Sequence, residues 1–115
     1  MLITKPYQND RAVEYARTWA LSRNPLFTDF TGRGGNCTNF VSQCVYAGSC
    51  VMNETPTFGW YYKSLDDRSP SWTGVEYFYD FFVQPIDVGV EAFLILCDLL
   101  VRLRENISNV LFKCL

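Results

Sequence analysis

The sequence contains no histidine. It has five cysteines, Cys37, Cys44, Cys50, Cys97 and Cys114, but no pair with C-x-x-C spacing. The usual Cys/His zinc sites need at least one of these patterns. The sequence therefore predicts no metal site, and nothing in it suggests another cofactor.

The sequence also lacks the features of exported, membrane-spanning and nucleic-acid-binding proteins. Its first twenty residues show no basic start followed by an apolar stretch and a cleavage site. The longest apolar region, residues 88–101, contains Glu91 and Asp98 and is shorter than the roughly 20 residues that a spanning helix needs. Ten basic residues face 12 acidic ones without a basic run. We therefore expect a cytoplasmic protein with reduced thiols, no transmembrane segment and no nucleic-acid partner, although an odd cysteine count leaves one or two disulfides open.

What the chain does have is an apolar composition and clear helix signals. With 115 residues, of which 49% are hydrophobic, it is long enough for one core. Asp10 is a candidate cap for a helix over residues 11–23, and Asn24-Pro25 ends it. A glycine-bearing loop follows over 26–35. The next helix is predicted over Cys37–Ala47, with Asn36 as its N-cap and Gly48 as a left-handed C-cap.

The second half of the chain is less regular. Residues 49–72 predict a long loop with short extended pieces, and Thr73 is a candidate cap for a helix through Phe82. Residues 87–114 predict one long helix with a broad apolar stripe. Two aromatic groups, one at 58–62 and one at 77–82, are more typical of core packing than of a substrate platform.

Cys37 is the residue whose position suggests chemistry. A thiol in the first turn of a helix meets unsatisfied N–H groups and the positive end of the helix dipole, and both favour the nucleophilic thiolate. Gly34 and Gly35 before it would let a substrate backbone come close. The alternative is that Cys37 is a small packing residue, since Phe40 and Cys44 follow at helical spacing. Spacing alone leaves both open.

A longer motif gives Cys37 a context. Residues 34–44, Gly-Gly-Asn-Cys-Thr-Asn-Phe-Val-Ser-Gln-Cys, resemble the signature of the bacterial putative amidase domain family, which is similar to papain-like cysteine hydrolases. The resemblance covers about residues 7–83. It is supported on both sides of the motif by Arg23-Asn24-Pro25, Trp60-Tyr61-Tyr62 and Ser71-Trp72-Thr73-Gly74-Val75.

The resemblance implies a truncated α+β cysteine-hydrolase-like domain over 1–84, helix-dominated in this chain, and a non-matching helical tail over 85–115. It implies that Cys37 is the nucleophile acting on a peptide or amide substrate, with Gly35, Asn36 and Thr38 on the oxyanion or substrate side. Family members often have aspartate where this chain has Asn36. They also continue past residue 83 into a strand-rich half that contains a histidine base, which this chain lacks. We therefore expect little or no amidase activity from this chain by itself.

Two further interpretations stay open. The chain is alternatively a non-catalytic binding module that uses its aromatic cluster and C-terminal helix. The tail itself either docks a partner or a second copy of the chain, or closes a core left open by the missing sheet. A truncated or frame-shifted reading frame after Val83 would also produce the change in character, and the sequence leaves open whether a longer product supplies the histidine.

Overall fold

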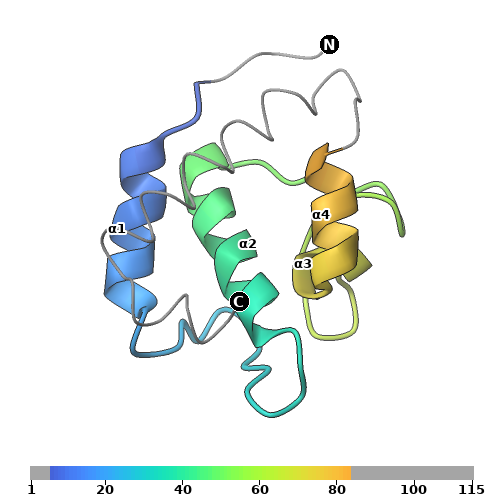
Figure 1. Ribbon diagram of the computed structural model, residues 1–115, viewed down its shortest axis with the longest axis horizontal. Helices are drawn as coiled ribbons and strands as arrows, with labels where there is room; N and C mark the ends of the chain where they lie inside the picture. The colour runs from blue at the N-terminus through green and yellow to red at the C-terminus, as the bar shows by residue number, and fades with distance from the viewer. Residues whose placement is uncertain (1–5, 84–115) are drawn as a thin grey trace.

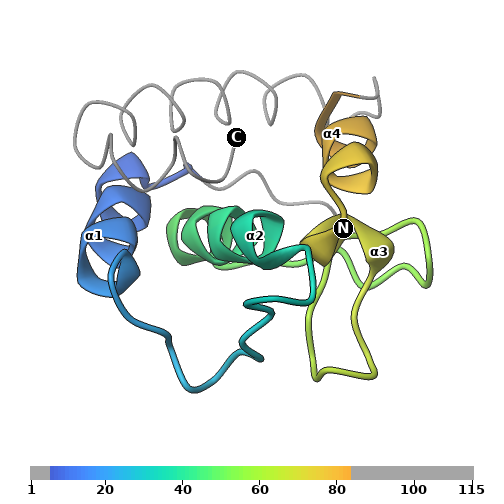
Figure 2. The same ribbon diagram turned by 60° about the horizontal axis from the view of Figure 1, so that its bottom comes forward.

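The computed structural model describes residues 6–83, and these residues form four helices. They are α1 (Asn9–Trp19), α2 (Asn36–Ser49), α3 (Pro70–Thr73) and α4 (Val75–Val83). Helix α2 packs against α1 on one side and α3 on the other, and α3 leads directly into α4. Both views show α2 in the middle of this arrangement (Figures 1 and 2).

Helix α1 approaches α2 through small residues. Ala12 and Ala16 are fully buried and Val13 nearly so, whereas the charged side chains of the helix are exposed. Alanine at the contact lets two helix backbones come close, so α1 buries little volume but fits tightly. The helix is shorter than the predicted 11–23. It begins after Gln8 rather than at a cap formed by Asp10, and Gln8 makes no side-chain capping bond.

The ends of α1 and α2 are tied together at Gly48. The N–H of Gln8 donates to the carbonyl oxygen of Gly48 at 2.9 Å. A Cβ on Gly48 would lie 2.7 Å from the ring of Tyr7, so only glycine lets that ring cover the helix. The prediction of Gly48 as a left-handed C-cap is therefore wrong. Cys50 takes that role at φ 58°, and its N–H donates to Tyr46 O at 2.7 Å.

The core is aromatic and centres on Trp72 of α3. Trp72 is fully buried, and its ring lies 5.0 Å from that of Trp60 and 5.9 Å from those of Tyr62 and Phe27, centroid to centroid. Phe82 of α4 packs edge-on against Trp60 at 5.3 Å. These contacts place most of the aromatic clusters in the core, as expected, while three members stay exposed: Phe58, Tyr77 and Tyr79.

The α+β class is wrong for the described residues. Between α2 and α3 the chain makes two isolated antiparallel bridges, Asn53 with Trp60 and Tyr62 with Arg68, and residues 6–83 contain no longer strand. A strand normally pairs over several residues. Here a turn at 56–58 and bends at 63–67 lie between the two members of each bridge, and neither pairing continues on the outer side. Residues 6–83 do not show a cysteine-hydrolase fold either.

Three predictions concern residues outside the described part of the chain, 6–83. They are the long C-terminal helix, its apolar stripe and self-association through it. The boundary between residues 84 and 85 stays a prediction. Within the described part of the chain, no helix is both long and apolar enough to cross a membrane.

Candidate active site around Cys37

The N-terminus of α2 is held by Gly35. This glycine is the N-cap residue at φ 84°, a left-handed conformation, and its carbonyl oxygen accepts the N–H of Asn39 at 2.9 Å. A Cβ on Gly35 would lie 2.6 Å from the carbonyl oxygen of Thr73. Both the backbone angle and the close approach to α3 therefore require glycine here. The motif's second glycine fixes where α2 starts.

Cys37 is the second residue of α2 and so lies in the first turn of the helix, as predicted. Its side chain is half-buried. In this structure Cys37 is disulfide-bonded, whereas Cys44 and Cys50 are free thiols. The expectation of reduced thiols therefore holds at Cys44 and Cys50 but not at Cys37. The thiol at the helix end must be released by reduction before it can attack anything.

Asn36 does not cap α2, contrary to prediction. It is the first residue of the helix, and its side chain reaches back to the preceding loop. Its Oδ1 accepts the N–H of Phe30 at 3.3 Å, and its Nδ2 donates to Thr31 Oγ1 at 3.5 Å. Thr38, which was also predicted to lie on the substrate side, is buried with 9% of its surface exposed. Asn36 is thus a loop anchor, and the Thr38 side chain lies inside the protein.

The buried face of α2 is polar at its N-terminal half, which the apolar spacing did not reveal. Asn39 accepts from the indole Nε1 of Trp72 at 2.9 Å and donates to Thr28 O at 3.2 Å. Ser42 accepts from Trp60 Nε1 at 3.1 Å and donates to Trp72 O at 3.0 Å. A buried indole N–H needs an acceptor. The tryptophans after the motif were the available signal, because each buried indole has to find such an acceptor.

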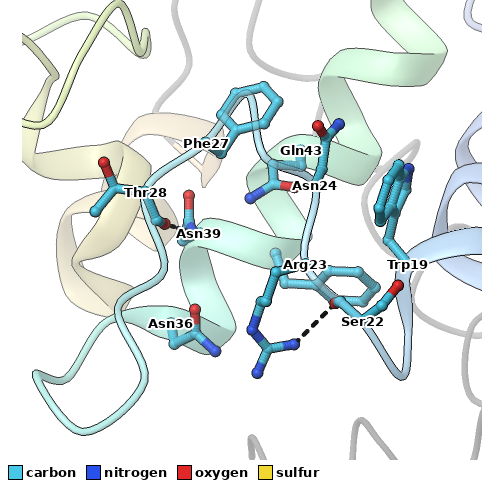
Figure 3. Close-up of a pocket in the computed structure, with 10 residues that line it drawn as sticks. Trp19, Ser22, Arg23, Asn24, Phe27, Thr28, Asn36, Asn39 and Gln43 are labelled. Atoms are coloured by element: carbon cyan, nitrogen blue, oxygen red, sulfur yellow. Dashed lines mark hydrogen bonds between the residues drawn. The ribbon is translucent and has the colours of Figure 1, made fainter.

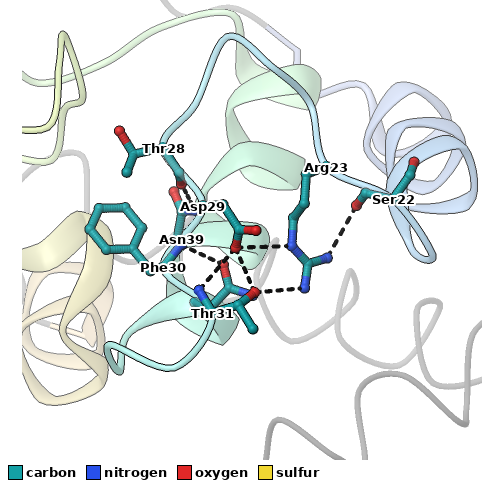
Figure 4. A network of polar contacts seen from close by, with 8 residues as sticks. Ser22, Arg23, Thr28, Asp29, Phe30, Thr31 and Asn39 are labelled. Atoms are coloured by element: carbon teal, nitrogen blue, oxygen red, sulfur yellow. Dashed lines mark hydrogen bonds and ion pairs between the residues drawn. The ribbon is translucent and has the colours of Figure 1, made fainter.

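The loop before α2 is organised by a small ionic network (Figure 4). Asp29 accepts from Arg23 Nε at 3.3 Å and from the N–H and Oγ1 of Thr31 at 2.9 and 2.5 Å. The Thr31 side-chain hydrogen bond is the main reason why the pKa of Asp29 lies below its ordinary value, with smaller help from Arg23. Both members of the ion pair are exposed, so we expect it to shape the loop more than to stabilise the fold.

A small pocket lies between this loop, the end of α1 and α2 (Figure 3). Its volume is about 10 Å³, roughly the space of one water molecule. Its walls include the aromatic rings of Trp19, Phe27 and Phe40, and Gln43 also lines it. Of the predicted site residues only Asn36 does so, and Cys37 lies outside it. The pocket is therefore beside the candidate nucleophile rather than around it.

A lysine or a tyrosine could in principle act in place of the missing histidine, and Lys63 and Tyr79 are two candidates. Lys63 forms an ion pair with Glu54 at 3.7 Å and sits over the Tyr61 ring at 5.8 Å from its centroid. Tyr79 is largely exposed on α4. Neither the contacts of Lys63 nor the exposed position of Tyr79 indicates a role as a catalytic base.

Comparison with known proteins identifies the family. A model of the family described as "Putative amidase domain" matches residues 6–92, most of the chain, so the chain belongs to this family. The uncharacterised protein YhbB of Bacillus subtilis (strain 168) is 41% identical over 73 residues, which are 60% of this chain and 22% of that protein. The chain thus spans about a fifth of the length of the curated relative it matches. No solved structure matches it.

Proposed function

We propose that this chain carries the nucleophile-bearing part of an amide hydrolase, with Cys37 as the attacking thiol. The observation that supports this most strongly is the position of Cys37 in the first turn of α2, two residues after the glycine N-cap, in a chain of the amidase family. Gly35, Asn36 and Thr38 would then contribute to the substrate side through their backbone, because the Asn36 side chain holds the preceding loop and the Thr38 side chain is buried.

The chemistry follows from this position. The Cys37 thiolate attacks the carbonyl carbon of an amide, and the oxygen of the tetrahedral intermediate takes the negative charge. Free backbone N–H groups at the start of α2 are suited to stabilise that oxyanion. Collapse of the intermediate breaks the C–N bond, but the departing amine must gain a proton. Water then hydrolyses the thioester and regenerates the thiol.

The proton for the amine is what this chain does not supply. It contains no histidine, and general acid–base help is typically worth about 10²–10⁴ in rate. We therefore propose that this chain by itself hydrolyses amides no faster than a variant without Cys37. A histidine contributed by another segment or chain would restore turnover.

A reactive ester separates the nucleophile from the missing acid. p-Nitrophenyl acetate releases a weakly basic phenolate, so its attack by a thiolate needs no proton donor. After reduction and removal of the reductant, we expect about one equivalent of nitrophenolate per chain in a burst, followed by slow turnover. Cys37→Ala should lose the burst, whereas Cys50→Ala, which removes an exposed free thiol, should keep it.

Amide substrates complete the test. Reduced wild-type chain and Cys37→Ala should hydrolyse amino-acid amides and short peptides at the same background rate. Wild-type turnover clearly above that of the variant would refute the proposed inactivity and show that another residue acts as the acid. An ester burst that survives Cys37→Ala would instead refute Cys37 as the nucleophile.

A further inference from the structure

The pocket beside α2 contains one amide donor that the fold leaves unused. Gln43 has only 6% of its surface exposed, and it lines the pocket from two turns beyond Asn36 on the same helix. Within residues 6–83, none of the hydrogen bonds satisfies its Nε2 group, although its Oε1 accepts one from Tyr15 OH. Nε2 is not one of the fully buried polar atoms without a partner in residues 6–83, so it is reached through the pocket and is open to an acceptor that enters there.

A chain of hydrogen bonds fixes the orientation of this amide. The N–H of Leu26 donates to Asn24 Oδ1 at 3.0 Å, which leaves Asn24 Nδ2 to donate to Tyr15 OH at 3.0 Å. The Tyr15 hydroxyl, having accepted that bond, gives its own proton to Gln43 Oε1. Burial raises the pKa of Tyr15, so this proton stays on the hydroxyl. Gln43 must therefore turn its Nε2 donor away from Tyr15.

The surroundings of this donor select the kind of group that it can bind. The pocket is walled by aromatic rings and has room for about one water-sized group. The positive charge of Arg23 at its rim is already opposed by Asp29. A neutral oxygen fits these conditions, whereas a carboxylate would find no unopposed cation among the described residues that line the pocket.

We propose that this pocket is a substrate subsite in which Gln43 Nε2 donates to one neutral carbonyl oxygen of a peptide or carboxamide. The proposal rests on the proposed amide-hydrolase function, because it supplies the class of substrate. Six residues of helix separate Gln43 from Cys37, a rise of about 9 Å, which an extended peptide covers in about three residues. The recognised carbonyl therefore belongs to a residue near the scissile bond rather than to the bond itself.

The test measures binding, so that it does not depend on catalysis by Cys37. The ¹⁵N-labelled chain is titrated with N-acetylalanine amide, and the side-chain amide of Gln43 and the indole N–H of Trp19 are followed by NMR. We expect saturable shifts of both signals, with little response to sodium acetate. The same result is expected for Cys37→Ala, which distinguishes failure of the subsite from failure of the nucleophile.

Two variants separate the donor from its support. Gln43→Met keeps the length of the side chain but removes the N–H, and it should weaken binding about three- to tenfold, as read from Trp19. Tyr15→Phe removes the same Tyr15–Gln43 hydrogen bond but keeps the donor, so it should weaken binding less. Near-UV circular dichroism checks that each variant is folded.

Three outcomes would overturn the proposal. One is equal loss of binding in the two variants, which would mean that Gln43 only supports the loop. Another is tighter binding of acetate than of the amide. The third is no saturable shift in the wild-type chain, as expected if the pocket holds a water molecule and nothing else.

Discussion

Replacing Asn39 with alanine should be among the most damaging single changes to the described fold. The substitution leaves Trp72 Nε1 without its 2.9 Å acceptor and Thr28 O without its 3.2 Å donor. Trp72 is fully buried, so its indole N–H cannot turn to water, whereas Thr28 lies in a half-buried loop beside the pocket and can be partly solvated. The two losses are therefore unequal.

The magnitude follows from these two groups. An unsatisfied buried group costs about 1–3 kcal/mol, so we assign about 2–3 kcal/mol to the indole and about 1 kcal/mol to the carbonyl. The total of about 3–4 kcal/mol is a large part of the 5–15 kcal/mol typical of a whole domain. For a domain of this size it corresponds to a fall in Tm of roughly 12–30 °C.

A double-mutant cycle tests the reasoning. Urea unfolding followed by far-UV circular dichroism would compare wild type, Asn39→Ala, Trp72→Phe and the double variant. Because phenylalanine has no indole N–H, Asn39→Ala in that background should cost only about 1 kcal/mol, which gives a coupling energy of about 2 kcal/mol. A cost below 1 kcal/mol in the wild-type background, or no coupling, would refute the structural role assigned to Asn39.

Two other changes probe the glycine N-cap and the free thiols. Gly35→Ala should destabilise the fold by about 2 kcal/mol or more, because it adds left-handed strain and a clash with the carbonyl oxygen of Thr73 at 2.6 Å. Gly34→Ala, at φ 80° with open space around it, should cost only the strain of about 1 kcal/mol. Equal shifts in the melting temperature of the two variants would contradict this. Burial strongly raises the pKa of the Cys44 thiol. Iodoacetamide should therefore label exposed Cys50 but not Cys44 in the native chain up to about pH 9, where an ordinary thiol is already largely ionised. Alkylation of Cys44 before unfolding, detected by mass spectrometry, would contradict its burial.

Local signals in the sequence located α1, α2 and α4 approximately, whereas α3 falls at the end of a stretch that was predicted as a loop. The glycines before Asn36 correctly mark the end of the loop before α2, because a left-handed backbone is incompatible with a continuing helix. The predicted stop of the first helix at Asn24-Pro25 is wrong, since α1 already ends at Trp19. The first-turn position of Cys37 and the aromatic core follow from spacing and composition in the same way. These features depend on residues close together in the chain.

Features that depend on distant residues were missed or wrong. Gly48 was predicted as a C-cap, but it is a glycine because the ring of Tyr7 lies across it. Asn36 was predicted as an N-cap, but its side chain forms hydrogen bonds with Phe30 and Thr31 instead. The α+β class was predicted on the expectation of strands, but residues 53–68 form only two isolated bridges. Each case needs a partner that sequence spacing does not name.

The sequence by itself determined most of α1, α2 and α4, the place of the candidate nucleophile in the first turn of α2, and the absence of histidine from this chain. The tertiary structure decided what the polar residues of the motif do. Asn39, Ser42 and Gln43 face the interior because two indoles, a loop carbonyl and the Tyr15 hydroxyl need hydrogen-bonding partners there. Burial makes each of those polar groups costly to leave unpaired, and only the fold brings them to α2.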